Sequence, residues 1–152
     1  MFDEDHGHTK QLLQAQWLQE LISRRGMELV GGMRVRVRPD DIVEITSLEA
    51  RKHHLDDAQD VVATIQRLTR GKRARVLLDL NVTGGLETDA RDYYKREGPG
   101  FATAIAVVTA NFLGRVVGNL IVTSHEGLVP VRLFDDEASA VAWLEEHPMR
   151  AR

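Results

Sequence analysis

Apolar and polar residues alternate between positions 33 and 48, with the period of two that is typical of β-strands. Met33, Val35 and Val37 alternate with three arginines, residues 39–41 have the composition of a turn, and residues 42–48 alternate again. The pattern predicts an antiparallel hairpin with one apolar and one basic face. The basic face is expected to protect a strand near the edge of a sheet from aggregation, and the alternative is that its arginines contact a phosphate backbone.

Helical spacing replaces this alternation farther along the chain. Apolar side chains three and four positions apart predict a helix over residues 55–69, closed by Gly71. Further helices are predicted over residues 88–97, ended by the Gly-Pro-Gly of residues 98–100, over residues 111–122, and after Asp135 or Asp136. Apolar runs at residues 75–80, 101–109 and 130–134 predict the strands between them.

Strands that alternate with helices imply a mostly parallel sheet. We therefore predict one α/β domain over residues 27–147, with a mixed, mostly parallel, five-stranded sheet. The N-terminal hairpin supplies its antiparallel pair, and the helices lie mainly on one face. Residues 1–8 are predicted to be a flexible terminus and residues 148–152 a tail.

An additional amphipathic helix is predicted over residues 9–26. Its apolar stripe consists of Leu13, Trp17, Leu18, Leu21 and Ile22. Such a stripe needs a cover, and the alternatives are the domain's own sheet, a second copy in a homodimer, or another partner. The first two are favoured, because the polar face is rich in Gln and poor in the Lys and Arg typical of membrane-bound helices.

Composition narrows the function. The chain has 152 residues, a formal net charge of −3 and no cysteine, so disulfides, thiolate catalysis and Cys-ligated metals are excluded. The net charge argues against nucleic acid as a partner. No apolar run is long enough for membrane insertion, and the acidic, polar start does not resemble a secretory signal, so a cytoplasmic location is expected.

Several local patterns point to one family. They are Leu77-Leu78-Asp79 at the end of a strand, the segment 87–93, the pair Gly118-Asn119, and the segment 130–135 followed by Ala140 and Trp143-Leu144. Over about residues 33–146 the chain resembles the STAS-like proteins of bacteria, which are small single-domain chains mostly without an assigned activity.

The resemblance implies a non-catalytic regulatory domain with a protein partner, such as a kinase or another regulatory protein. Related anti-sigma factor antagonists are switched by phosphorylation at the start of the helix after the third strand, and Thr88 stands at that place. Glu87 replaces the usual preceding Asp, and Asp89-Ala90 replaces the usual Ser-Gly. The alternative is that Thr88 only caps the helix.

A surface around Thr88 is therefore the predicted site for a partner or ligand. Its other members are Asp79, Asn81, Thr83, Glu87, Arg91 and Tyr94. Asp79 and Asn81 follow a central strand, where α/β sheets bind ligands, although Asp79 could simply accept N–H bonds within its loop. No spacing of these carboxylates, and no glycine loop for phosphates, indicates an enzyme, a metal or a cofactor. The histidines are interpreted as solvated loop residues.

A second hypothesis is a carrier or sensor of a small apolar ligand or lipid. Its pocket would be lined by Phe101, Phe112, Leu113, Val116 and Val117. A sizeable cavity between helix and sheet would favour this hypothesis, and a solid core would exclude it.

Overall fold

The computed structural model describes residues 26–147. The elements in chain order are β1 (Met27–Val30), β2 (Met33–Val37), β3 (Val43–Ser47), α2 (Leu55–Leu68), β4 (Ala74–Asp79), α3 (Thr88–Phe101), β5 (Ala102–Val108), α4 (Phe112–Ser124), β6 (Val131–Phe134) and α5 (Glu137–Glu145). The predicted flexible terminus, the predicted tail and all but the last residue of the predicted N-terminal helix lie outside the described residues.

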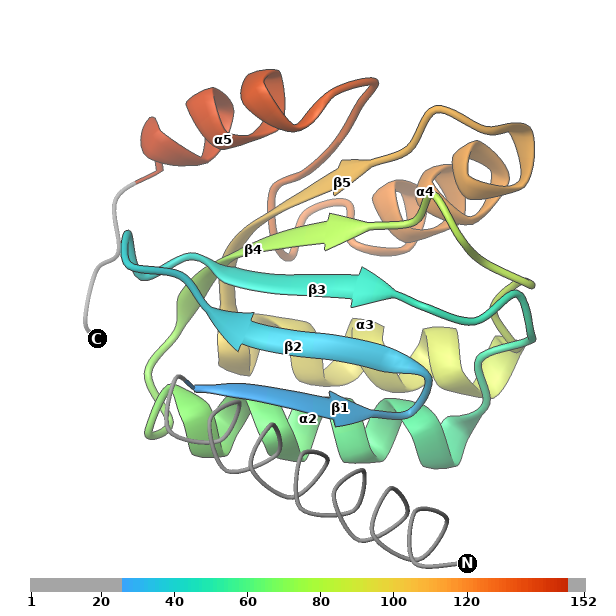
Figure 1. Cartoon of the computed structure of the whole chain (residues 1–152), viewed down its shortest axis with the longest axis horizontal. Helices are drawn as coiled ribbons and strands as arrows, with labels where there is room; N and C mark the ends of the chain where they lie inside the picture. Colours follow the sequence, from blue (N-terminus) through green and yellow to red (C-terminus); the bar gives the residue numbers. More distant parts are fainter. Residues whose placement is uncertain (1–25, 148–152) are drawn as a thin grey trace, which may run out of the picture.

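The six strands form one sheet whose order follows the chain, β1-β2-β3-β4-β5-β6 (Figure 1). The first three strands are antiparallel, and β3 to β6 are parallel. The prediction of five strands was wrong, because β1 has only four residues and no clear alternation. Its pairing with β2 depends on Gly31 and Gly32, whose φ angles of 58° and 74° close a tight turn.

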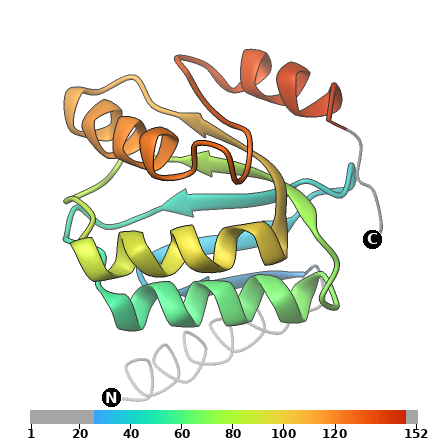
Figure 2. The ribbon, with the colours of Figure 1, turned by 180° about the vertical axis from the view of Figure 1, so that it is seen from behind.

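Helices α2, α3 and α4 cover one face of the sheet and α5 covers the other, which confirms that most helices share a face (Figures 1 and 2). The connections between parallel strands are right-handed, and each successive strand joins the same edge of the sheet. The connecting helices therefore lie on the same face. The main core lies under the first three helices, and a smaller core that includes Leu77, Ala106 and Leu144 lies under α5.

Helix α3 is longer than predicted and continues through Pro99 to Phe101. Pro99 lies in the last turn, where it removes only one helical hydrogen bond. The adjacent Gly98 packs against His125, because a Cβ atom there would lie 3.0 Å from Nε2 of that ring. The Gly-Pro-Gly sequence therefore allows close packing of α3 against the end of α4 and does not stop the helix.

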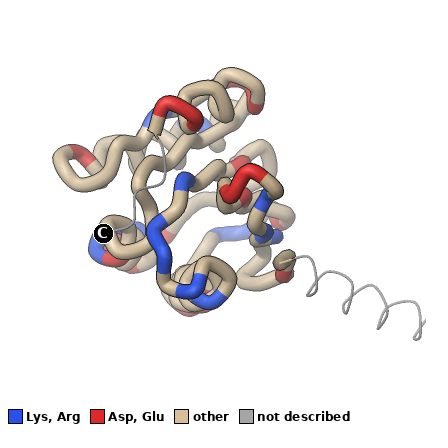
Figure 3. The backbone as a smooth tube through the Cα atoms, turned by 90° about the vertical axis from the view of Figure 1, so that its left-hand side faces the viewer, with Lys and Arg blue, Asp and Glu red and all other residues tan. Residues whose placement is uncertain are grey.

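Basic residues gather at the end of the sheet where the parallel strands begin (Figure 3). Arg70, Lys72, Arg73 and Arg75 lie in or near the segment that joins α2 to β4. Arg73 donates to the carbonyl of Ala102 at 3.2 Å, and Arg75 donates to the carbonyl of Asp40 at 2.8 Å. Within residues 26–147, no helix is long and apolar enough to cross a membrane.

Candidate functional site

The loops after β4 and β5 meet at the carboxyl ends of the parallel strands. Oδ1 of Asp79 accepts hydrogen bonds from the backbone N–H and the side-chain amide of Asn81, both at 2.9 Å. Oδ1 of Asn81 in turn accepts from the backbone of Ala110 at 2.8 Å, and its carbonyl accepts from the side chain of Asn111. Asp79 and Asn81 therefore fix the two loops to each other, as the loop alternative for Asp79 predicts.

Helix α3 begins beside these loops. Glu87 is the N-cap residue and Thr88, which is exposed, is the first helical residue. The carboxylate of Glu87 lies 3.5 Å from the ammonium group of Lys52, and Nε of Arg91 lies 3.9 Å from the carboxylate of Asp92. The interpretation of Thr88 as the cap is wrong by one position, and the structure leaves this hydroxyl at the surface.

The segment before α3 crosses closely over the segment before α2. His53 and Leu86 form a parallel β-bridge, with hydrogen bonds from His53 N to Gly85 O and from Glu87 N to His53 O. Gly84 lies directly on Arg51, and a Cβ atom at Gly84 would overlap the Arg51 backbone. Only glycine fits at this crossing, which holds the start of α3 against the start of α2.

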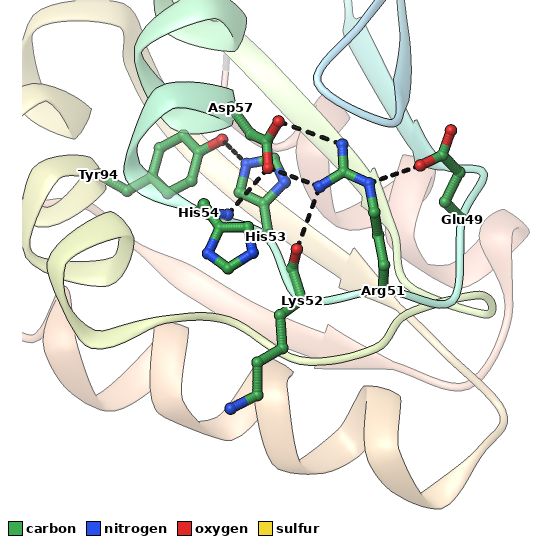
Figure 4. A network of polar contacts seen from close by, with 7 residues as sticks. All are labelled: Glu49, Arg51, Lys52, His53, His54, Asp57 and Tyr94. Atoms are coloured by element: carbon green, nitrogen blue, oxygen red, sulfur yellow. Dashed lines mark hydrogen bonds and ion pairs between the residues drawn. The ribbon is translucent and has the colours of Figure 1, made fainter.

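Arg51 is the centre of a polar network on the outside of this crossing (Figure 4). Its guanidinium group donates to Glu49 at 2.6 Å, to Asp57 at 2.8 and 3.1 Å and to the carbonyl of Lys52 at 3.2 Å. The Asp57 carboxylate also accepts from the backbone N–H of His54 at 2.9 Å. These bonds, chiefly those from Arg51, lower the pKa of Asp57 to about 2.

Two aromatic residues meet on the inside of the same crossing. Nε2 of His53 lies 2.7 Å from the hydroxyl of Tyr94, and the two rings stack with centroids 5.7 Å apart. Burial lowers the pKa of His53 and raises the pKa of Tyr94. The lowered pKa favours neutral His53, whose Nε2 shares this hydrogen bond with the Tyr94 hydroxyl. Tyr94 belongs to the interior and does not join the surface around Thr88.

His53 and Tyr94 lie at one side of a cavity of about 70 Å³ between the sheet and α2, α3 and α4. Its wall is mostly apolar, and includes Val76, Phe101, Val117 and Ile121. Thr83, His53, Tyr94 and His125 are its polar members. A single water molecule needs about 10–15 Å³ of cavity volume, so this cavity has room for several waters or for a small molecule.

Two of the predicted cavity residues, Phe101 and Val117, line this cavity. The other three lie on the outside of α4, where Phe112 is 83% exposed, Leu113 41% and Val116 40%. The volume also falls short of the roughly 300 Å³ of common drug-sized ligand pockets. The core is therefore neither solid nor large enough for a whole lipid.

Treating all histidines as solvated was wrong for two of those described. His53 is 6% exposed, and His125 is 2% exposed. Nδ1 of His125 lies 2.9 Å from the carbonyl of Ile121, and Nε2 lies 3.3 Å from the carbonyl of Tyr94. No periodic signal marks these positions, because each follows an irregular segment or a helix end.

The predicted site thus divides into an outer and an inner part. Glu87, Thr88 and Arg91 form a polar surface at the start of α3, while Thr83 and Tyr94 line the cavity. His53, which sequence reasoning did not select, joins the two parts, because its backbone bonds to Gly85 and Glu87 and its ring bonds to Tyr94. Among residues 26–147, no group of three His, Asp or Glu side chains is placed to hold a metal ion.

Comparisons with known proteins define the family and the fold. Residues 35–148 match the model of a family described as a domain of unknown function, DUF7793. No curated protein matches the sequence. A similar structure is that of an uncharacterised DUF3478 protein with a SpoIIAA-like fold from Shewanella loihica PV-4, with 17% identity and a TM-score of 0.54. The match covers 77% of this chain and 96% of the other, and confirms the predicted STAS-like fold.

Proposed function

Because this chain belongs to the DUF7793 family, a domain of unknown function, we propose its role from its own geometry: it is a non-catalytic regulatory domain that binds a protein partner through the surface around Thr88. One observation carries the proposal. Thr88 is exposed at the first position of a 14-residue helix that is fixed against the rest of the domain.

A helix start suits a phosphate-dependent switch. The free N–H groups and the positive end of the helix dipole stabilise a phosphate of about −1.5 to −2 charge. The ammonium group of Lys52 lies near the start of α3, because it contacts the carboxylate of Glu87, the residue before Thr88. The carboxylates of Glu87 and Asp89 oppose the added charge, so phosphorylation would break the Lys52–Glu87 contact and change the surface that a partner meets.

The experiment compares the partners of three full-length variants by quantitative affinity capture from the native cells. Thr88→Glu adds a negative charge and Thr88→Val removes the hydroxyl. Gln66→Glu is the control, because it adds the same charge at an exposed position near the C-terminal end of α2. We expect Thr88→Glu to lose or gain at least one partner relative to Gln66→Glu. Identical partner sets for all three variants, with no phosphate on Thr88 in the native protein, would contradict the proposal.

The cavity favours a second candidate function. We propose that it binds a small apolar molecule with one hydrogen-bonding group, in the manner of a sensor. An apolar wall with a few polar groups is typical of ligand sites, and here the His53–Tyr94 pair offers the polar group. The volume of about 70 Å³ restricts the ligand to a short aliphatic or single-ring compound.

The test measures thermal stability in a series of aliphatic alcohols and carboxylic acids with about four to eight carbons. A ligand at concentration L that binds only the folded chain stabilises it by RT ln(1 + L/Kd), so the melting temperature rises with the logarithm of the ligand concentration above Kd. Val117→Ile, which fills part of the cavity, should abolish this shift, whereas Leu128→Ala, at an exposed position outside the lining, should retain it. No shift with any compound up to millimolar concentration would exclude a ligand of this class.

A further inference from the structure

Helix α4 is apolar on two sides. Its inner side packs on the sheet through Gly114, Val117 and Gly118, and a Cβ atom at Gly118 would lie 2.8 Å from Cδ1 of Leu133. Its outer side exposes Phe112 (83%), Leu113 (41%), Val116 (40%) and Leu120 (39%). A helix that is apolar on both sides is normally buried on both sides.

The outer face of α4, defined by these four side chains, is a continuous stripe. At 100° per residue the four positions fall within one sector of about 100°, the width of a stripe that packs against another element. The single charged residue of α4, Arg115, lies outside this sector and contacts Asp135 at 3.0 Å. The stripe therefore needs no charge to be desolvated when it is covered.

The chain carries a second apolar stripe of the same kind, in the segment 9–25, which belongs to the amphipathic helix predicted over residues 9–26. This segment leads directly through Gly26 into β1, at one edge of the sheet, while α4 packs at the opposite edge on β6. Six strands span about 24 Å, and α2 and α3 lie between. The helix predicted over residues 9–26 would be about 27 Å long and would end directly at β1, which leaves no residues to carry it to α4 of its own chain.

We propose that the chain forms a homodimer in which the segment 9–25 of each copy lies along the outer face of α4 of the other copy. Each apolar stripe then covers the other, and the arrangement is symmetric because the same contact is made twice, once in each direction. The interface does not involve Thr88, so the proposal stands apart from the proposed function.

The area decides between this arrangement and direct pairing of two α4 helices. The outer face of α4 exposes roughly 350 Å² of apolar surface, so pairing two of them buries only about 700 Å², which is below the ~1,200 Å² of a specific interface. Exchange of the N-terminal segments adds Trp17 and four aliphatic side chains from each copy. The total then approaches the ~1,600 Å² of a stable complex.

The absence of cysteine from the chain permits a direct test by disulfide cross-linking. One full-length variant carries Trp17→Cys and another carries Val116→Cys, and the two are mixed and oxidised. We expect a disulfide-linked pair between position 17 of one chain and position 116 of the other as the main product. A dominant 116–116 pair, or no cross-link in the mixture, overturns the proposal. A chain with both substitutions that closes an intramolecular disulfide instead also overturns it.

A second measurement covers the risk that a cysteine disturbs the contact. Leu21→Ser and Val116→Ser should each weaken the dimer at least about tenfold in sedimentation experiments, and mixing the two should restore a heterodimer, since one intact contact remains. Leu29→Ser, at a position that is 54% exposed on β1, is the control and should leave the dimer unchanged. A wild-type chain that stays monomeric at ~100 μM, or that instead binds lipid vesicles as a monomer, overturns the proposal.

Discussion

A hydrogen bond of 2.7 Å between the hydroxyl group of Tyr94 and Nε2 of His53 joins α3 to the segment before α2. His53 also forms the β-bridge with Leu86, just ahead of α3. One buried residue therefore connects the exposed start of α3, through its backbone, with the cavity, through its ring, which makes the His53–Tyr94 pair the first target for mutation.

Replacing Tyr94 with Phe should destabilise the domain by about 1–2 kcal/mol, because buried His53 loses its hydrogen-bond partner. Urea unfolding at pH 7.5 measures the loss. Tyr93→Phe is the matched control, since no hydrogen bond joins its hydroxyl to another described residue, and should change stability by less than about 0.5 kcal/mol. Equal effects of the two substitutions would show that the Tyr94–His53 bond contributes nothing.

Stability should decrease as the pH falls below about 6.5, the ordinary pKa of histidine. Burial lowers the pKa of His53 in the folded protein, so between that lowered pKa and 6.5 the unfolded chain binds a proton that the folded chain does not. The stability is fully present above 6.5 and is lost as the pH falls through the folded pKa. Urea unfolding in steps from pH 7.5 to 5 should show a smaller decrease for His53→Gln. His54→Gln, at an exposed neighbour, should retain the wild-type slope.

Asp57→Asn should destabilise the domain by less than about 1 kcal/mol, since the ion pair with Arg51 is partly open to solvent. The loss has a distinct pH dependence. The folded pKa of about 2 lies below the ordinary value of 3.8, so the contribution is present above 3.8 and disappears as the pH falls toward 2. Acid unfolding curves measure this difference, with exposed Asp56→Asn as the control. Parallel curves for wild type and Asp57→Asn would count against the role of the Arg51 network.

Gly84→Ala should destabilise by about 2–3 kcal/mol, because its methyl group would overlap the backbone of Arg51 and force the two crossing segments apart. Gly100→Ala is the control, since a Cβ atom at Gly100 meets nothing within 4 Å, and it should be neutral or slightly stabilising. Thermal unfolding compares the two. If both variants melt at the wild-type temperature, the crossing is looser than the structure shows.

The sequence predicted most of the fold because its elements have clear periods. The alternation of β2 and the helical spacing of α2 gave nearly the observed bounds. Strand β1 was missed because four residues without alternation carry little signal, and its partner is recognised only through the Gly31-Gly32 turn. The extent of α3 was underestimated because Pro99 is tolerated in a last turn, a position that depends on the packing of Gly98 against His125.

The candidate site was predicted only in its outer part. Thr88 and Glu87 follow from their place in the family pattern, which is local in sequence. The contacts of Arg51, His53 and Gly84 join segments more than 30 positions apart, and no periodic pattern encodes such a crossing. The cavity likewise depends on how closely three helices approach the sheet, which composition does not specify.

The strand order has a consequence for how the protein is made. Every strand after the first pairs with the strand that precedes it in the chain, so each new strand leaving the ribosome finds its neighbour already synthesised. No strand must wait for a later one to fill a gap in the sheet, and the closing loops stay short in sequence. The domain can therefore assemble progressively from its N-terminal hairpin, with β6 and α5 as the last layer added.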